Sequence, residues 1–338
     1  MDNVFIISEI AQAHDGSLGM AHSYIDALAQ SGVDAIKFQT HIAEAESSDF
    51  EEFRVPFSYQ DRSRFDYWKR MEFTAQQWAG LKEHCDQKGV EFMSSPFSVA
   101  AVEMLEKIGV KRYKIGSGEL SNYLMLHHVA QTGKPIILSS GMSDWTELDR
   151  TISFLKPYGN ELTLLQCTTA YPTLPNQWGL SVIKEMRDRY QVSVGFSDHS
   201  GDIVASTAAA ALGAQVIEFH VVFDRQMFGP DSRASITIDE TTRLVKGIKQ
   251  IREALKSSAL KDNHQGFSDL KTMFGKSLAV NKNLPGGHIL ALSDLESKKP
   301  AGKGISADQF LRVVGTALVN EKKQWEFLQG EDLRPIKD

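Results

Sequence analysis

Short apolar runs alternate along most of the chain with stretches whose apolar positions recur every three or four residues. Eight runs predict strands, at residues 4–10, 35–40, 91–95, 112–117, 135–140, 162–168, 193–197 and 215–222. The stretches between them predict helices, including residues 17–31, 74–88, 100–108, 202–212 and 239–255. Such alternation predicts a parallel sheet with crossover helices, and eight repeats favour a closed (β/α)8 TIM barrel over an open doubly wound sheet.

The pattern changes near residue 257. Residues 256–271 are polar and contain helix breakers, and beyond residue 274 the segments are short, with turns at 285–287 and 300–304. We expect a barrel over residues 1–257, a linker over 258–273 and a small β-rich domain over 274–338. The long connection 41–73, rich in charge and aromatic residues, predicts an extended loop over the barrel mouth.

Composition narrows the class of protein. The chain has 338 residues and a net charge of −6, which gives no support for bulk attraction to nucleic acid or to an anionic membrane. Two cysteines predict neither a disulfide framework nor a thiolate zinc site. No apolar run approaches the ~18 residues that span a membrane, and the N-terminus enters a strand without a basic leader. We therefore expect a cytoplasmic protein.

Polar residues gather where the predicted strands end. Barrel active sites are built from residues at the carboxyl ends of strands, so these side chains are expected to face one pocket. In chain order the set is Glu9, His14, Lys37, Gln39, Ser94, Ser95, Lys114, Ser117, Glu119, Ser139, Ser140, Thr168, Thr169, Tyr171, Ser197, Asp198, His199, Glu218 and His220.

Two histidines of this set point to a metal. His199 and His220 end consecutive strands joined by one predicted helix, so they emerge at the same end of the sheet. Neutral imidazole is the commonest protein metal ligand, and Asp198 and Glu218 lie beside the two rings in sequence. The pattern predicts a divalent metal site.

The two lysines of the set indicate an anionic ligand. A buried lysine must be paired or functional, because desolvating a lone charge costs several kcal/mol. For Lys37 alone, structural pairing explains the residue equally well; eight strands with polar ends favour an active site. Lys37 and Lys114, with hydroxyls and the Gly116 and Gly118 amides, suit a phosphate and a carboxylate on one small ligand.

Two other features have simpler interpretations. His127 and His128 lie in an amphipathic stretch and are expected to pack on a helix surface. The aromatic segment 57–68 is interpreted as a packed loop. His14, just past a strand end, is the better candidate for the pocket.

The strand-end residues resemble those of the sialic acid synthase family. The matching segments are SEI (8–10), IKFQ (36–39), SPF (95–97), YKIGSGE (113–119), SGM (140–142), CT (167–168), YP (171–172), GFSDH (195–199) and GPD (229–231). The tail segments KSL (276–278), KKP (298–300) and GIS (304–306) are similar to the family's small antifreeze-like (SAF) domain. The resemblance covers nearly the whole chain, in order.

This resemblance implies an enzyme that condenses phosphoenolpyruvate with an N-acylhexosamine, giving a nonulosonic acid and phosphate. It implies Mn²⁺ or Mg²⁺ held by His199 and His220, and a domain-swapped homodimer. The implied catalytic residues are Glu9, Lys37, Lys114 and Glu218. The implied substrate-binding residues are Ser95, Ser117, Ser140, Thr169, Tyr171, Ser197, Asp231 and Lys299.

Some positions depart from the family pattern, and we expect them to affect the sugar rather than the chemistry. They are Ala11 and Ala13 in the first motif, Thr169, Phe219 between Glu218 and His220, and the tail residues Lys299 and Ala301. Lysine cannot reproduce the bidentate contacts of the family's tail arginine. The product class thus stays open among sialic, legionaminic, pseudaminic and spore-coat sugars.

Two alternatives remain at this stage. A barrel aldolase could use Lys114 for a Schiff base and would need no metal. A non-catalytic sugar-binding or scaffold protein could keep the fold, and the substitutions at Ala13, Thr169 and Phe219 favour it. The retained pairs Lys37 with Lys114 and His199 with His220 argue against it.

Overall fold

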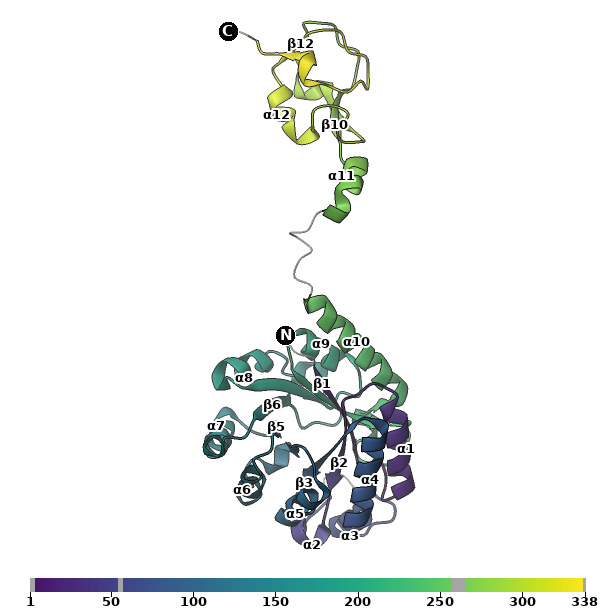
Figure 1. Cartoon of the computed structure of the whole chain (residues 1–338), viewed down its shortest axis with the longest axis vertical. Helices are drawn as coiled ribbons and strands as arrows, with labels where there is room; N and C mark the ends of the chain where they lie inside the picture. The colour runs from purple at the N-terminus through teal and green to yellow at the C-terminus, as the bar shows by residue number, and fades with distance from the viewer. Residues whose placement is uncertain (1–3, 54–56, 257–264, 337–338) are drawn as a thin grey trace. The chain divides into compact units, whose positions relative to one another are not determined.

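A computed structural model describes residues 4–53, 57–256 and 265–336 of the chain (Figure 1). The chain divides into two compact units, Met1–Lys256 and Ser257–Asp338, which are described separately. Among the described residues, no helix is both long and apolar enough to cross a membrane.

The first unit is a parallel barrel of eight strands, followed by a ninth short strand, β9 (Ile236–Thr237), that pairs with β8. The hydrogen-bonded order β3-β2-β1-β8-β7-β6-β5-β4 brings β3 and β4 side by side and nearly closes the barrel. The TIM-barrel prediction is confirmed. The strands are β1 (Phe5–Ala11), β2 (Ala35–Thr40), β3 (Glu91–Pro96), β4 (Tyr113–Ile115), β5 (Ile136–Ser139), β6 (Leu162–Cys167), β7 (Ser193–Asp198) and β8 (Val216–Val222).

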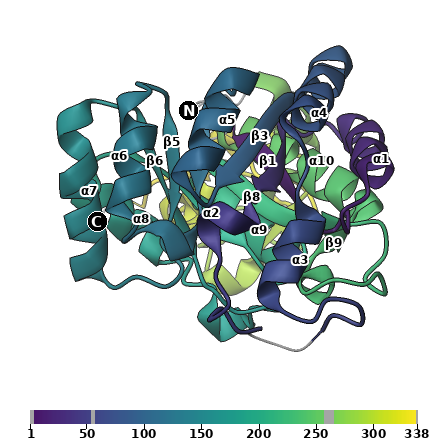
Figure 2. The same ribbon diagram turned by 90° about the horizontal axis from the view of Figure 1, so that it is seen from below.

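Helices surround these strands (Figures 1 and 2). They are α1 (Leu18–Ala29), α4 (Ala75–Lys88), α5 (Val99–Ile108), α6 (Tyr123–Gln131), α7 (Trp145–Leu155), α8 (Val182–Tyr190), α9 (Val204–Ala211) and α10 (Ile238–Lys256). Local sequence sets their ends: Thr74 forms a capping box with Gln77 at the start of α4, and Gly89 ends it in the left-handed conformation (φ 74°).

The connection between β2 and α4 is more ordered than the extended loop predicted from sequence. It contains the short helices α2 (Ala43–Glu46) and α3 (Arg64–Met71). Its aromatic side chains form an apolar cluster of their own around Tyr67 and Trp68. The sequence prediction missed this because the helices are short and their apolar residues pack on one another rather than on the barrel.

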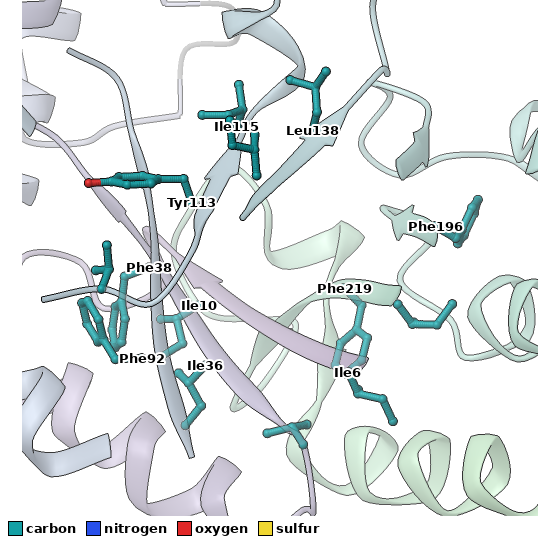
Figure 3. Close-up of a cluster of buried hydrophobic side chains, with 14 of the residues drawn as sticks. Ile6, Ile10, Ile36, Phe38, Phe92, Tyr113, Ile115, Leu138, Phe196 and Phe219 are labelled. Carbon is teal, nitrogen blue, oxygen red and sulfur yellow. The ribbon is translucent and has the colours of Figure 1, made fainter. Parts of the chain in front are cut away.

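Side chains on the strands alternate between two environments. Outward-facing residues such as Ile6, Ile36, Phe38 and Phe196 pack in the layer between strands and helices (Figure 3). Inward-facing residues at the start of the strands form a second, smaller cluster inside the barrel: Ile7, Ala35, Met93, Ile137, Leu165 and Val216. The period of two along each strand produces both layers.

The second unit is small and built from antiparallel pairs. Strand β10 (Ser277–Val280) pairs with β11 (Leu295–Lys298), and β12 (Ala317–Leu318) pairs with β13 (Leu333–Arg334). Its core is Leu278, Val280, Leu284, Leu290, Val313, Leu318 and Leu328. The β-rich character predicted for the tail is confirmed. Helix α11 (Ser268–Phe274) lies where the sequence predicted part of a linker; residues 258–264 of that linker lie outside the described residues.

Candidate active site

On the inward-facing side of the strands, the residues change from apolar to polar toward the carboxyl ends. Two residues beyond Ile7, Ala35 and Val216 come Glu9, Lys37 and Glu218, and Met93 is followed in the same way by Ser95. These side chains floor a cavity of about 900 Å³ at the carboxyl ends of the strands. The alternation of side chains along the strands therefore places a polar site directly above the inward-facing apolar cluster of the barrel.

Four buried charges dominate the floor of this cavity. Lys37 Nζ lies 2.7 Å from Glu9 Oε1 and 3.5 Å from Glu218 Oε2. Lys114 Nζ lies 3.2 Å from Glu218 Oε1, which also accepts a hydrogen bond from the Ser197 hydroxyl at 3.0 Å. Each of the four charged side chains is at most 4% exposed. The two lysines and two glutamates thus compensate one another without solvent.

Their mutual attraction sets the charge states. Burial by itself would raise the pKa of Glu9, but the positive charges of Lys37, His220 and Lys114 outweigh it and hold that pKa well below its usual value. Burial likewise opposes the charged form of Lys37, and the carboxylates of Glu218 and Glu9 raise its pKa. The cavity therefore presents fixed ammonium and carboxylate groups.

Two imidazoles form one wall. The ring centroids of His199 and His220 are 5.2 Å apart, and Tyr171 stacks on His199 at 4.3 Å. His199 Nδ1 lies 2.9 Å from the Thr168 carbonyl oxygen and donates there, and Nε2 lies 3.3 Å from the Tyr171 hydroxyl. Such a second-layer carbonyl orients a ligating histidine in metal sites.

The chemistry of these residues suits the divalent metal implied by the resemblance. His220 Nε2 lies 3.3 Å from Glu9 Oε2, and its buried Nδ1 has no hydrogen-bond partner among the described residues. No group of three or more His, Cys, Asp or Glu side chains within residues 4–53, 57–256 and 265–336 is arranged to enclose an ion. Two imidazoles beside a carboxylate fit an ion that keeps water and takes substrate oxygens, which is how Mg²⁺ is usually held. The residues fit.

Most predicted site residues line this one cavity. They are Glu9, Lys37, Ser95, Lys114, Ser117, Thr169, Tyr171, Ser197, His199, Glu218, His220 and Asp231. Ser140 is not in the lining; its hydroxyl donates to the Leu165 carbonyl at 3.0 Å, and Ser139 faces the cavity instead. Lys299 belongs to the second unit, where its ammonium lies over the Phe274 ring at 4.8 Å.

Two strand-end residues that we expected near the site do not line the cavity. His14 does not line the cavity; its ring packs at a tilt of 36° against that of Phe73, and its Nδ1 accepts a hydrogen bond from the Gly16 amide at 3.1 Å. Asp198 does not line the cavity either, and it accepts hydrogen bonds from the Ser206 amide and hydroxyl in α9. Both side chains are polar strand-end residues with local structural roles, which position alone does not reveal.

Most of the barrel positions that depart from the family pattern do not line the cavity. Phe219 is 2% exposed and faces the helices (Figure 3), because neighbours on a strand point to opposite faces. Ala11 is buried and Ala13 packs against the core, and neither lines the cavity. Of the departures in the barrel, Thr169 is the one that faces the cavity.

Sequence reasoning missed several lining residues. Gln12 and His41 lie just beyond the ends of β1 and β2, and Arg233 follows β8 by a long loop. Arg64 and Trp68 come from α3, and Phe57 from the same connection, which was interpreted only as a packed loop. The charge and aromatic content of that connection was the available signal.

Comparison with known proteins identifies the chain's relatives. The family model described as the NeuB family matches residues 24–259. The chain is 32% identical to the N,N'-diacetyllegionaminic acid synthase of Campylobacter jejuni, over 97% of this chain and 100% of that protein. It is 31% identical to the human N-acetylneuraminate-9-phosphate synthase, over 92% and 87% of the two chains.

A solved structure agrees with these sequence matches. The N-acetylneuraminic acid (sialic acid) synthetase from Leptospira borgpetersenii, crystallised in complex with citrate, superposes with a TM-score of 0.70 at 31% identity. The match covers 80% of this chain and 91% of that one. Sequence and fold therefore point to the same group of proteins.

Proposed function

The chain belongs to the NeuB family of phosphoenolpyruvate-dependent nonulosonic acid synthases, and from this premise we propose that it condenses phosphoenolpyruvate with an N-acylated hexose. The observation that carries the proposal is the buried four-charge network with two imidazoles beside it, at the mouth of a barrel. The acceptor is a ManNAc-like sugar. Relatives of the chain include synthases of legionaminic and N-acetylneuraminic acids.

Lys37 and Lys114 bind the enol phosphate. Their ammonium groups, with the hydroxyls of Ser95, Ser117 and Ser197, offer donors for the phosphate and the carboxylate of one small ligand. In the free protein, Glu218 lies between the two lysines and compensates their charge. A bound anion replaces part of that compensation.

The reaction joins C3 of the enol to the aldehyde carbon of the sugar. The aldehyde oxygen gains an electron pair and takes a proton, water adds at C2, and the C–O bond to phosphate breaks. A divalent metal bound at His199 and His220 supplies Lewis-acid stabilisation of the developing negative charge on the aldehyde oxygen. Lys37 and Lys114 offset the charge of the departing phosphate.

Glu9 acts as an acceptor for sugar hydroxyls. Its lowered pKa keeps it ionised at neutral pH, and an ionised carboxylate only accepts hydrogen bonds. We therefore assign Glu9 to orienting the acceptor rather than to delivering a proton. The homodimer and the role of Lys299 in a partner's site remain part of this proposal.

The contacts of Lys114 argue against a Schiff-base aldolase. Its amine is paired with Glu218 at 3.2 Å, whereas imine formation needs an amine that is free to attack a carbonyl carbon. Borohydride trapping in the presence of pyruvate tests the point. We expect no adduct, and a covalent adduct on Lys114 would overturn the proposed mechanism.

Phosphate release tests the proposed reaction. The full chain is incubated with phosphoenolpyruvate, Mn²⁺ and a panel of N-acylated hexoses, and we expect release that depends on one class of sugar. Lys114→Met should abolish it, whereas Lys134→Met, which breaks a partly exposed pair with Glu106 on the barrel surface, should not. Retained metal binding without release from any sugar would favour the non-catalytic alternative.

A further inference from the structure

The imidazole of His41 is held between two aromatic rings at the edge of the cavity. His41 follows β2 and is 2% exposed. Its ring centroid lies 3.8 Å from that of Trp68 and 4.5 Å from that of Phe97, with interplanar angles of 19° and 12°. Because both faces are covered, the ring has one plane available, and its two nitrogens have fixed directions.

Both nitrogens of His41 face oxygen atoms. Nδ1 lies 2.6 Å from Glu46 Oε1, and Nε2 lies 3.2 Å from Gln39 Oε1. Carboxylate and amide oxygens accept hydrogen bonds, so the contacts are satisfied together when His41 donates from both nitrogens. The geometry fits a ring that donates from Nδ1 to the Glu46 carboxylate and from Nε2 to the Gln39 amide oxygen.

The amide of Gln39 then has a single satisfactory orientation. Its oxygen also accepts from Gln12 Nε2, which lies 3.3 Å from His41 Nε2, so two donors converge on an oxygen with two lone pairs. Its nitrogen donates to Glu9 Oε1 at 2.7 Å. A flipped amide would place oxygen against the Glu9 carboxylate and an NH₂ group against two donors.

We propose that His41, held by Glu46, is a positioning residue that fixes the Gln39 amide and, through it, the Glu9 carboxylate. Four buried or nearly buried side chains thus connect α2 with the floor of the cavity in the order Glu46, His41, Gln39, Glu9. The functional part rests on the proposed synthase activity, in which Glu9 orients the acceptor sugar and Gln39 lines the cavity beside it. Loss of this series of hydrogen bonds then lowers kcat/KM for the acceptor sugar and leaves the KM for phosphoenolpyruvate unchanged.

A matched pair of substitutions separates hydrogen bonding from packing. His41→Gln and His41→Met have similar size and both lose the aromatic stack, but only glutamine donates to Gln39 Oε1. We expect kcat/KM for the acceptor sugar to be at least about tenfold lower in His41→Met than in His41→Gln. The KM for phosphoenolpyruvate should agree within about twofold between the two, since Lys37 and Lys114 are intact. Equal kcat/KM values for the sugar would overturn the functional role.

A spectroscopic measurement tests the hydrogen-bond chain without any turnover. In the full-length chain labelled with ¹⁵N-histidine, the His41 signals are those missing from His41→Gln, and its Nδ1 proton should resonate far downfield because it donates to the Glu46 carboxylate. Glu46→Gln should move this signal upfield, whereas Glu44→Gln, a 74% exposed carboxylate of the same helix, should not. A His41 signal that Glu46→Gln leaves unmoved overturns the proposal, even if no sugar releases phosphate and the proposed function itself has failed.

Discussion

The ammonium nitrogen of Lys37 lies 2.7 Å from Oε1 of Glu9, at the bottom of the cavity and almost without solvent. The same ammonium lies 3.5 Å from Glu218 and 3.3 Å from the Ser95 hydroxyl. Lys37 therefore stabilises the fold by compensating buried carboxylates, and it also supplies positive charge to the ligand position. Both roles predict measurable effects.

Removing the Lys37 charge should destabilise the barrel as well as abolish phosphate release. Lys37→Met leaves Glu9 and Glu218 buried beside one remaining lysine, and breaking such a pair typically costs about 3–5 kcal/mol. Urea unfolding measures the loss. Lys184→Met, which removes an 80% exposed lysine paired with Asp188, is the control and should change stability little. Equal stability of the two variants would contradict the compensation described for Lys37.

Buried His14 should make the protein sensitive to mild acid. Burial, with the charges of His41 and Arg70, lowers the pKa of His14 from 6.5 to about 3. The unfolded chain therefore binds a proton near pH 6.5 that the folded chain refuses, and stability falls as pH decreases from about 6.5 toward 3. His14→Asn keeps an acceptor for the Gly16 amide and removes the titration.

Urea unfolding at two pH values checks this. Between pH 7.5 and 5.5 the wild type should lose about 1.4 kcal/mol more of its unfolding free energy than His14→Asn. This is the effect of one proton that binds only to the unfolded chain, over roughly one pH unit below 6.5. Parallel losses in the two proteins would show that His14 is not the acid-sensitive group.

The sequence predicted the barrel because its signal is repeated and local. Each strand is a short apolar run and each helix has a 3.6-residue period, so eight independent segments support one architecture. The site followed from the rule that barrel activity lies at strand ends, which placed Glu9, Lys37 and Glu218 correctly in one cavity.

The errors have a common physical cause. The side of the strand to which a residue points depends on register, and a one-residue step reverses it. We expected Ser140 to bind substrate and Phe219 to affect the sugar, whereas their neighbours Ser139, Glu218 and His220 face the cavity. Contributions from outside the strand ends, such as Arg64 and Trp68 of α3, depend on how the long connection folds back, which no local pattern encodes.

Gly141 should be essential for the positions of the Ser117 and Thr169 hydroxyls at the cavity. Its amide donates to the Ser117 hydroxyl at 2.9 Å, and a Cβ there would lie 2.6 Å from Thr169 Oγ1 and 2.8 Å from Ser117 Oγ. Gly141→Ala should therefore displace both hydroxyls and raise KM for phosphoenolpyruvate on the order of tenfold. Gly80→Ala, whose Cβ would meet no described atom within 4 Å, is the control and should retain wild-type kinetics.

Metal removal should abolish turnover reversibly. Chelation is expected to stop phosphate release and added Mn²⁺ to restore it, because the developing oxyanion otherwise lacks a cation beside it. Mn²⁺ binding measured by calorimetry should be lost in both His199→Ala and His220→Ala. His127→Ala, which removes a histidine hydrogen-bonded to Tyr158 on the barrel surface, should bind Mn²⁺ normally. Binding that survives both site substitutions would place the ion elsewhere.

The most direct test of the synthase activity is the stoichiometry of one complete reaction. With phosphoenolpyruvate, Mn²⁺ and the preferred N-acylhexosamine, mass spectrometry should find one nonulosonic acid, three carbons longer than the sugar, for each phosphate released. Lys37→Met and His199→Ala should form neither product. Release of phosphate without the nine-carbon acid, or no release with any N-acylated hexose while Mn²⁺ still binds, would contradict the proposed function.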